Sequence, residues 1–171
     1  MSIASEMEEK LNSQINKEFY SAYLYLSMSF QAQEMQLRGF AHWFRVQSNE
    51  ELGHALKMAQ YLIDRGGTVE LSSVVAAQSK WATVVEMFKC TCEQEAIVSA
   101  KINELMQFAL ETKDYAACQF LGWFVQEQVE EEAQASEILG ELELSIAAPE
   151  ALLILDRELG EREDSSCQSE E

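Results

Sequence analysis

A carboxylate and an imidazole stand three residues apart in the run Glu50-Glu51-Leu52-Gly53-His54, inside a long segment with helical periodicity. At this spacing Glu51 and His54 share one face of a helix. The rest of that face is apolar and consists of Phe40, Phe44, Met58 and Leu62. A buried charge is costly unless it is paired or bound to a metal. The two side chains are therefore candidate metal ligands.

Three further segments with helical periodicity carry polar residues on stripes that are otherwise apolar. These residues are Glu18, Glu95, Gln128 and Glu131. Each lies near the middle of its segment, so in an antiparallel bundle all of them meet Glu51 and His54 at about one level. For one such residue alone, a hydrogen-bonded core position or a solvent-facing position is the better interpretation. Six residues on four segments favour a common site.

The chemistry of such a site follows from its ligands. Four carboxylates in a dry core repel one another, and a divalent metal removes that penalty. Oxygen-rich ligation with one imidazole suits iron or manganese better than structural zinc, which prefers cysteine and histidine. Two ions are expected, because one ion could not use all the carboxylates.

The elements that must position these residues are helices. With 7 Gly, 1 Pro and 47% hydrophobic residues among 171, the composition is typical of one all-helical domain. Capping boxes at Ser5-x-x-Glu8 and Thr83-x-x-Glu86, an N-cap at Asp114 and the pair Gly66-Gly67 mark helix ends. The periodicity predicts helices over about 5–36, 38–65, 83–111, 114–144 and 150–159.

The segment from Thr68 to Lys80 lacks helical periodicity and is rich in β-branched and small residues. Extended at ~3.3 Å per residue it reaches roughly 40 Å, about the length of the preceding helix. It can therefore cross the bundle and make the second and third helices parallel. We expect an all-α, ferritin-like four-helix bundle with one long crossover and a short fifth C-terminal helix. The bundle domain is expected at 1–162, and the acidic residues 163–171 are expected to be disordered.

The charge of the chain limits its partners. Its 30 acidic and 12 basic residues give a formal charge of −18, which argues against nucleic acid or an anionic membrane and favours cations. We recognise no signal peptide or transmembrane run, so a cytoplasmic protein is expected, or an organellar one whose transit peptide has been removed. The four cysteines are expected to be reduced, and no function is assigned to them.

Five runs resemble the ferritins, and the non-haem bacterial-type ferritins more closely than the animal ones. They are NKEFYS at 16–21, EELGH at 50–54, KINEL at 101–105, FLGW to EQVEEE within 120–132, and ILDREL at 154–159. The resemblance covers nearly the whole chain apart from the acidic tail. It implies an iron-storage ferritin, a ferroxidase that oxidises Fe(II) to Fe(III) with dioxygen or hydrogen peroxide. The product would be stored as a ferric mineral inside a homo-oligomeric, 24-subunit cage.

The resemblance also assigns roles to the polar stripes. A first iron would be held by Glu18, Glu51 and His54, and a second by Glu51, Glu95 and Glu131, with Glu51 bridging and Gln128 alongside. Tyr25, two turns after Glu18, matches a tyrosine near the family's iron centre and could supply an electron. As a single aromatic residue on a core stripe, Tyr25 is otherwise explained by packing.

An additional, third iron site of the family matches Glu50, Glu127 and Glu130, with Glu131 shared. The alternative for these residues is an exposed acidic helix face. No haem is expected, for two reasons. The haem-binding Met of the bacterioferritins is replaced by Leu52, and their second Glu-x-x-His is replaced by Gln128-x-x-Glu131.

Two other functions stay open at this point. A di-iron oxidase or peroxide-detoxifying enzyme could use the same bundle without storing iron, although it would not need the short helix at 150–159. A metal-free helical interaction module is the other alternative. The mass of the particle separates storage from the enzyme, and a lack of Fe(II) binding would favour the interaction module.

Overall fold

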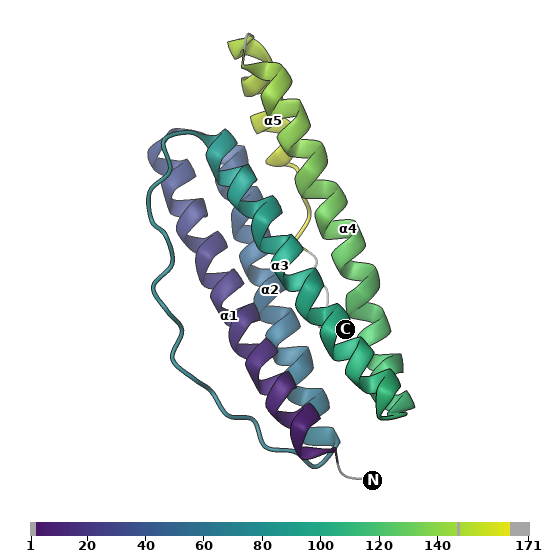
Figure 1. Cartoon of the computed structure of the whole chain (residues 1–171). Coiled ribbons are helices and arrows are strands. Elements are labelled where there is room, and N and C mark those ends of the chain that lie inside the picture. The colour runs from purple at the N-terminus through teal and green to yellow at the C-terminus, as the bar shows by residue number, and fades with distance from the viewer. Residues whose placement is uncertain (1–2, 147, 165–171) are drawn as a thin grey trace.

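Five helices make up the fold in a computed structural model that describes residues 3–146 and 148–164 (Figure 1). They are α1 (Ser5–Glu34), α2 (Arg38–Asp64), α3 (Val84–Glu111), α4 (Tyr115–Ser145) and α5 (Pro149–Leu159). The predicted all-α class is confirmed, and the predicted helix bounds agree to within about two residues. None of the helices in the described ranges is long and apolar enough to cross a membrane.

Three of the helices end in the same left-handed turn. The residues in that turn are Gln36 (φ 64°), Gly66 (φ 74°) and Lys113 (φ 57°), after α1, α2 and α3. The next amide donates to a carbonyl five residues back in each case: Leu37 to Ala32, Gly67 to Leu62, and Asp114 to Ala109. These Schellman endings satisfy carbonyls at the helix end and stop each helix within one residue or two.

The predicted N-terminal caps are confirmed for two helices. Thr83 accepts a hydrogen bond from the amide of Glu86 (3.2 Å), and Asp114 accepts one from the first turn of α4 (3.1 Å). The capping box at Ser5 is wrong. The residue before α1 is Ala4 in an extended conformation, so Ser5 already lies in the helix and no side chain caps its first turn.

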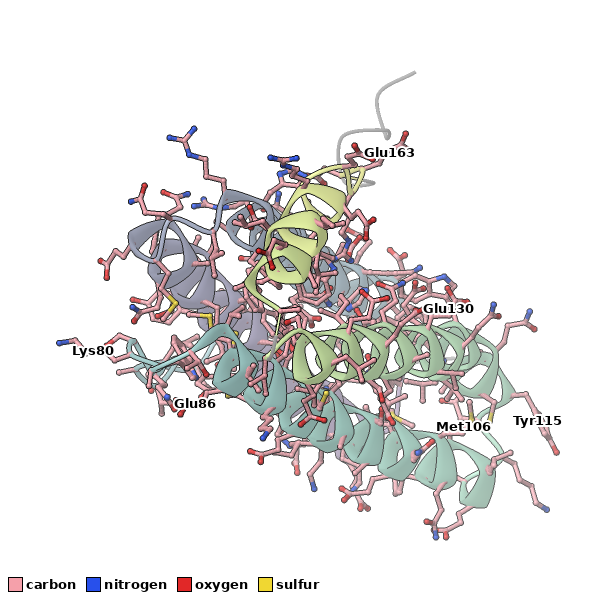
Figure 2. All side chains as sticks on the ribbon, turned by 90° about the horizontal axis from the view of Figure 1, so that it is seen from above. Lys80, Glu86, Met106, Tyr115, Glu130 and Glu163 are labelled. Carbon is pink, nitrogen blue, oxygen red and sulfur yellow. The ribbon has the colours of Figure 1, made fainter. Side chains whose placement is uncertain are left out.

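The long connector between α2 and α3 follows α1 along the outside of the bundle (Figure 1). The side-chain amide of Asn12 donates to the carbonyl of Thr68 (2.9 Å), and the Ser27 hydroxyl donates to the carbonyl of Gln78 (2.8 Å). Figure 2 shows Lys80 at the end of this connector. The crossover predicted from the sequence is confirmed, and it leaves α2 and α3 parallel.

The core between the helices forms two apolar clusters. One contains Leu24, Met28, Phe40, Phe88 and Leu142, and the other contains Met7, Leu11, Met58, Leu62 and Leu121. Buried polar side chains occupy the sequence positions between the two clusters on each of the four long helices. The bundle is therefore apolar toward both ends and polar in the middle.

α5 packs against α2 and α4 at one end of the bundle (Figure 1). The Asp156 carboxylate accepts hydrogen bonds from the amides of Gly39 (2.8 Å) and Phe40 (3.0 Å). It thereby satisfies two donors in the first turn of α2 and places a negative charge at the positive end of that helix. Gly39 permits this approach, because a Cβ there would lie 1.4 Å from the Asp156 carbonyl oxygen.

We expect Gly39→Ala to lower the unfolding temperature, because the added methyl group must push α5 away from α2. Loss of the Asp156 cap alone costs about 0.5–2 kcal/mol. Gly140→Ala is the matched control, since nothing lies within 4 Å of a Cβ at that position. Inside a helix, Ala is favoured over Gly by roughly 1 kcal/mol, so the control should be at least as stable as the parent. Thermal unfolding followed by circular dichroism measures both, and an unchanged Gly39→Ala variant would contradict this docking of α5.

Candidate metal centre

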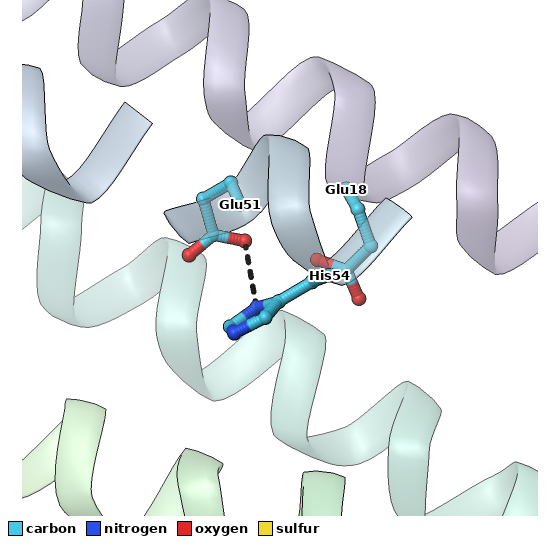
Figure 3. A group of neighbouring side chains, drawn as sticks. All are labelled: Glu18, Glu51 and His54. Carbon is cyan, nitrogen blue, oxygen red and sulfur yellow. Dashed lines mark ion pairs between the residues drawn. The ribbon is translucent and has the colours of Figure 1, made fainter. Parts of the chain in front are cut away.

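Six buried polar side chains from the four long helices form the layer between the two apolar clusters. They are Glu18 from α1, Glu51 and His54 from α2, Glu95 from α3, and Gln128 and Glu131 from α4, with exposed fractions between 1% and 8%. The burial predicted from the apolar stripes is therefore confirmed. Figure 3 shows Glu18, Glu51 and His54 directed toward the same space between the helices. We call these six residues the inner layer.

The inner layer contains two groups of three ligands that share one carboxylate. Glu18, Glu51 and His54 can each place one ligand atom within 4.8 Å of the others, and so can Glu51, Glu95 and Glu131. His54 Nδ1 lies 3.7 Å from Glu51 Oε2 (Figure 3). Because Glu51 belongs to both groups, its carboxylate is placed to bridge two cations. The division of ligands is the one that the sequence resemblance implies.

Two glutamine side-chain amides donate hydrogen bonds to carboxylates of the inner layer. Gln14 Nε2 donates to Glu18 Oε1 (2.8 Å). Gln47 Nε2 donates to both Glu51 Oε1 (3.1 Å) and Glu131 Oε1 (3.0 Å). Neither glutamine was singled out from the sequence, although each stands four residues before its glutamate on the same helix face. That spacing, repeated in α1 and α2, is the signal that could have found them.

Two side chains donate hydrogen bonds to the carboxylate of Glu95. Gln128 Nε2 lies 3.2 Å from Glu95 Oε2, and the Tyr25 hydroxyl donates to Glu95 Oε1. Tyr25 is completely buried, and its ring stacks on that of Phe44 with centroids 6.4 Å apart. Tyr25 therefore serves the core packing and also contacts the inner layer directly.

Aromatic rings fix the position of the imidazole. The His54 ring meets Trp123 and Phe124 edge to face, with centroids 5.4 Å and 5.8 Å apart. Both rings come from α4, so this helix packs directly against the imidazole. They restrict its rotation without competing for its nitrogen atoms.

Two carboxylate oxygens of the inner layer are buried without a hydrogen-bond partner among the described residues. They are Glu18 Oε2 and Glu131 Oε2. An unpaired buried acceptor costs on the order of 1–3 kcal/mol, and more if it is charged. A cation bound in each of the two groups would supply a partner to one of these oxygens, so this donor set fits two metal ions.

The acidic groups resist ionisation when no cation is present. Burial raises the pKa of Glu51 well above its usual range, and the nearby Glu95 and Glu18 raise it further. Burial likewise raises the pKa of Glu131 strongly, with Glu51 and Glu95 adding to it. Burial also raises the pKa of Glu95. Protons or cations must therefore neutralise these groups, and the two compete for the same oxygens.

The additional acidic residues Glu50, Glu127 and Glu130 line a pocket of about 250 Å³ between α2 and α4. We call these three residues the outer cluster; Figure 2 shows Glu130 on α4. Burial raises the pKa of Glu127, and Glu130 and Glu50 contribute to the shift. Glu50 Oε2 is bound by Arg162 Nη2 at 2.5 Å. Within the described residues, the outer cluster does not converge as the two inner groups do, so a third iron site stays a prediction.

The acidic tail is only partly covered by the structure. Residues 165–171, predicted to be disordered, lie outside the described residues. Asp164 accepts a hydrogen bond from Asn49 of α2 (2.9 Å), and Arg162 contacts the same helix. Residues 163 and 164 are within the described part of the chain, and the boundary between the bundle domain and a disordered tail stays a prediction. A short acidic run cannot show from composition alone that it will pair with a neighbouring helix.

Comparisons with known proteins agree with this geometry. The Ferritin family model, described as a ferritin-like domain, matches residues 8–145. A bacterial non-heme ferritin of Bacteroides fragilis is 39% identical over 160 residues, which cover 94% of this chain and 99% of that one. Another of Staphylococcus aureus is 34% identical over 160 residues, with 94% and 96% covered.

A solved structure is similar over the same extent. An open pore ferritin from the hyperthermophilic archaeon Archaeoglobus fulgidus matches with a TM-score of 0.93 and 46% sequence identity. The match covers 95% of this chain and 100% of that one. Sequence and structure thus agree over nearly the whole length, and the chain belongs to the ferritin family.

Proposed function

We propose that this iron-storage ferritin oxidises Fe(II) at the inner layer: Glu18, Glu51, His54, Glu95, Gln128 and Glu131. The observation that carries the proposal is the pair of buried three-ligand groups that share Glu51. The two carboxylate oxygens without a hydrogen-bond partner among the described residues support it, because bound cations would pair with them. The relatives named bacterial non-heme ferritin support iron as the cation.

Two Fe(II) ions are the substrates, one for each group of three ligands. Carboxylates are hard ligands that stabilise Fe(III) over Fe(II), so the inner layer favours oxidation of the ions it holds. Two neighbouring ions can deliver two electrons to one oxidant together. Dioxygen takes up these electrons with two protons to give hydrogen peroxide, and hydrogen peroxide takes up the same to give two molecules of water. The Fe(III) ions then pass to the mineral inside the cage.

Tyr25 is proposed as a source of a further electron for the oxidant. Its hydroxyl donates a hydrogen bond to Glu95, so the phenol proton can pass to that carboxylate as the ring loses an electron. Burial raises the pKa of Tyr25 well above its usual range, and Glu95 and Glu51 raise it further. The phenol therefore keeps its proton at neutral pH until it is oxidised.

We propose a cytoplasmic cage of 24 copies as the storage form. Large apolar side chains are exposed on several elements, including Phe30, Leu71, Val75 and Leu153, whose exposed fractions exceed 50%. Exposed apolar side chains on this scale are typical of surfaces that contact other copies. A particle of many hundreds of kilodaltons by size-exclusion chromatography supports storage, whereas a dimer would favour a di-iron oxidase without a store.

We predict that Glu51→Gln and His54→Ala each abolish rapid Fe(II) oxidation. Glu51→Gln removes the charged oxygens shared by both groups, and His54→Ala removes the only imidazole of the inner layer. Mutation of a residue that only hydrogen-bonds to a metal ligand typically lowers metal affinity or activity about 10–100-fold. The loss of a ligand itself should lower the oxidation rate at least as much. Stopped-flow absorbance of Fe(III) formation in air measures the rate.

Glu137→Gln, an exposed position on the same helix as Glu131, is the matched control and should oxidise Fe(II) as fast as the parent. All three variants should assemble to the size of the parent particle. Parent-like oxidation by Glu51→Gln would refute the assignment of the site.

We also predict that Glu51→Gln stabilises the metal-free protein as the pH rises. Because the pKa of Glu51 is raised in the folded state, the folded chain holds a proton that the unfolded chain releases. The parent therefore loses stability between the unfolded and the folded pKa as pH increases. The variant lacks this titration, so its advantage should be absent near pH 4 and grow toward pH 8.

Urea unfolding in the presence of a chelator measures this difference. Saturating Zn²⁺ should reverse the order, because the parent then gains the binding free energy that the variant has lost. A constant difference between the two proteins across this pH range would contradict the account, and Glu137→Gln should follow the parent throughout.

A further inference from the structure

The segment that follows α5 runs along α2 and brings a guanidinium to the edge of the inner layer. His42 Nε2 lies 2.7 Å from the carbonyl oxygen of Arg162, and Arg162 Nη1 donates to the carbonyl of Trp43 (3.4 Å). The guanidinium carbon sits 4.7 Å from the centre of the Trp43 ring. Three contacts to neighbouring positions of one helix hold this arginine in place.

The guanidinium of Arg162 contacts the carboxylate of Glu50, and the charges of Glu131 and Asp164 act on it as well. Its Nη2 lies 2.5 Å from Glu50 Oε2, and its side chain is only 17% exposed. Burial lowers the pKa of Arg162, while Glu50, Glu131 and Asp164 raise it. An arginine keeps its charge under such conditions. Arg162 therefore neutralises negative charge at Glu50 in this pocket.

Arg162 also contacts the amide that supports the inner layer. Its Nη2 donates to Gln47 Oε1 (3.0 Å), so the amide nitrogen of Gln47 is turned toward Glu51 and Glu131. With the guanidinium on one side and two carboxylates on the other, the Gln47 amide is satisfied in one orientation only. Gln47 therefore connects the guanidinium of Arg162 to the carboxylates of Glu51 and Glu131 through hydrogen bonds.

Arg162 lines the same pocket between α2 and α4 as the outer cluster. His54 and Glu131 of the inner layer line it as well. A divalent cation that binds Glu50 would stand close to the guanidinium, and the two positive charges would repel each other strongly in this half-buried place. The ion and the docked arginine therefore compete for Glu50.

We propose that Arg162 determines which sites a divalent cation can fill: its guanidinium occupies the cation position of the outer cluster, so ions enter the two inner groups and reach the outer cluster only when Arg162 moves away. The proposal deepens the proposed function, on which it rests for metal binding at the inner layer. Because competition is reciprocal, removing the guanidinium should tighten cation binding at the outer cluster.

The test is calorimetric titration of the assembled, metal-free protein with Zn²⁺, which binds without redox chemistry. The parent should take up two Zn²⁺ tightly per subunit, one for each inner group. Arg162→Gln should bind a third, with an affinity at least about tenfold above that of the parent for a third ion. Arg157→Gln removes the same charge from an exposed position of α5 and should match the parent.

The double variant Arg162→Gln with Glu50→Gln shows where the third ion binds, because it should lose that ion again. Anomalous scattering from Zn²⁺-soaked crystals of Arg162→Gln should place the ion among Glu50, Glu127 and Glu130. The proposal is overturned if Arg162→Gln binds Zn²⁺ as the parent does, including when its unfolding temperature has fallen, since a purely structural role would change stability alone. It is also overturned if the parent binds the third ion equally tightly.

Failure of the proposed function gives a different result. If Glu51→Gln bound Zn²⁺ with the stoichiometry and affinity of the parent, the inner layer would not be the metal site. If Glu51→Gln loses the inner ions while Arg162→Gln gains none, the inner site stands and only the role of Arg162 is refuted.

Discussion

Repulsion among four carboxylates in one buried layer is the constraint that the rest of the structure must satisfy. Glu18, Glu51, Glu95 and Glu131 come from four different helices and are almost completely buried. Without cations, burial raises the pKa of Glu51, Glu95 and Glu131, and the neighbouring carboxylates raise it further. The apolar clusters on both sides of the layer supply the burial that offsets this cost. Helices of 27 to 31 residues are long enough to carry both clusters with the polar layer between them.

The side chains behind the carboxylates are neutral donors, and this choice decides what the inner layer can bind. Gln14, Gln47 and Gln128 donate hydrogen bonds to the carboxylates and leave their charge uncompensated. Lysine or arginine in the same places would pair with the carboxylates and compete with metal ions. The guanidinium of Arg162 lies outside the inner layer and donates a hydrogen bond to Gln47 Oε1, and its charge acts on Glu131 and Glu51 from there. The neutral glutamines therefore orient the carboxylate ligands, and the neutralisation of their charge is left to protons or bound cations.

Helical periodicity was enough to predict the inner layer, because each of its members interrupts an apolar stripe. The length of the segment between α2 and α3 was enough to predict the crossover. Gly66 predicted the C-terminus of α2, and Thr83 and Asp114 predicted the N-termini of α3 and α4. Other features have a weaker signal or none. The spacing of Gln47 and Glu51 is a weak signal because it also occurs on exposed helices, and the contact of Gln47 with Glu131 follows only from the packing of α2 against α4. Asp156 and Arg162 act on α2 from more than 110 residues away, through a docking geometry that local sequence does not encode. Ser5 showed the reverse error, a cap motif that lies one residue inside its helix.

The fifth helix links the end of the bundle to its polar centre. Asp156 fixes α5 on the first turn of α2, and six residues later Arg162 reaches Gln47, two turns farther along α2. Gly39 allows the backbone of α2 to approach the backbone of α5 at Asp156. The position of Arg162 therefore depends on this contact between Gly39 and Asp156. The outward side of α5 presents Leu153 and Ile154, both more than half exposed. In the proposed cage, the helix that offers this apolar face to neighbouring copies also sets the position of Arg162, so assembly and the proposed control of cation binding depend on one structural element.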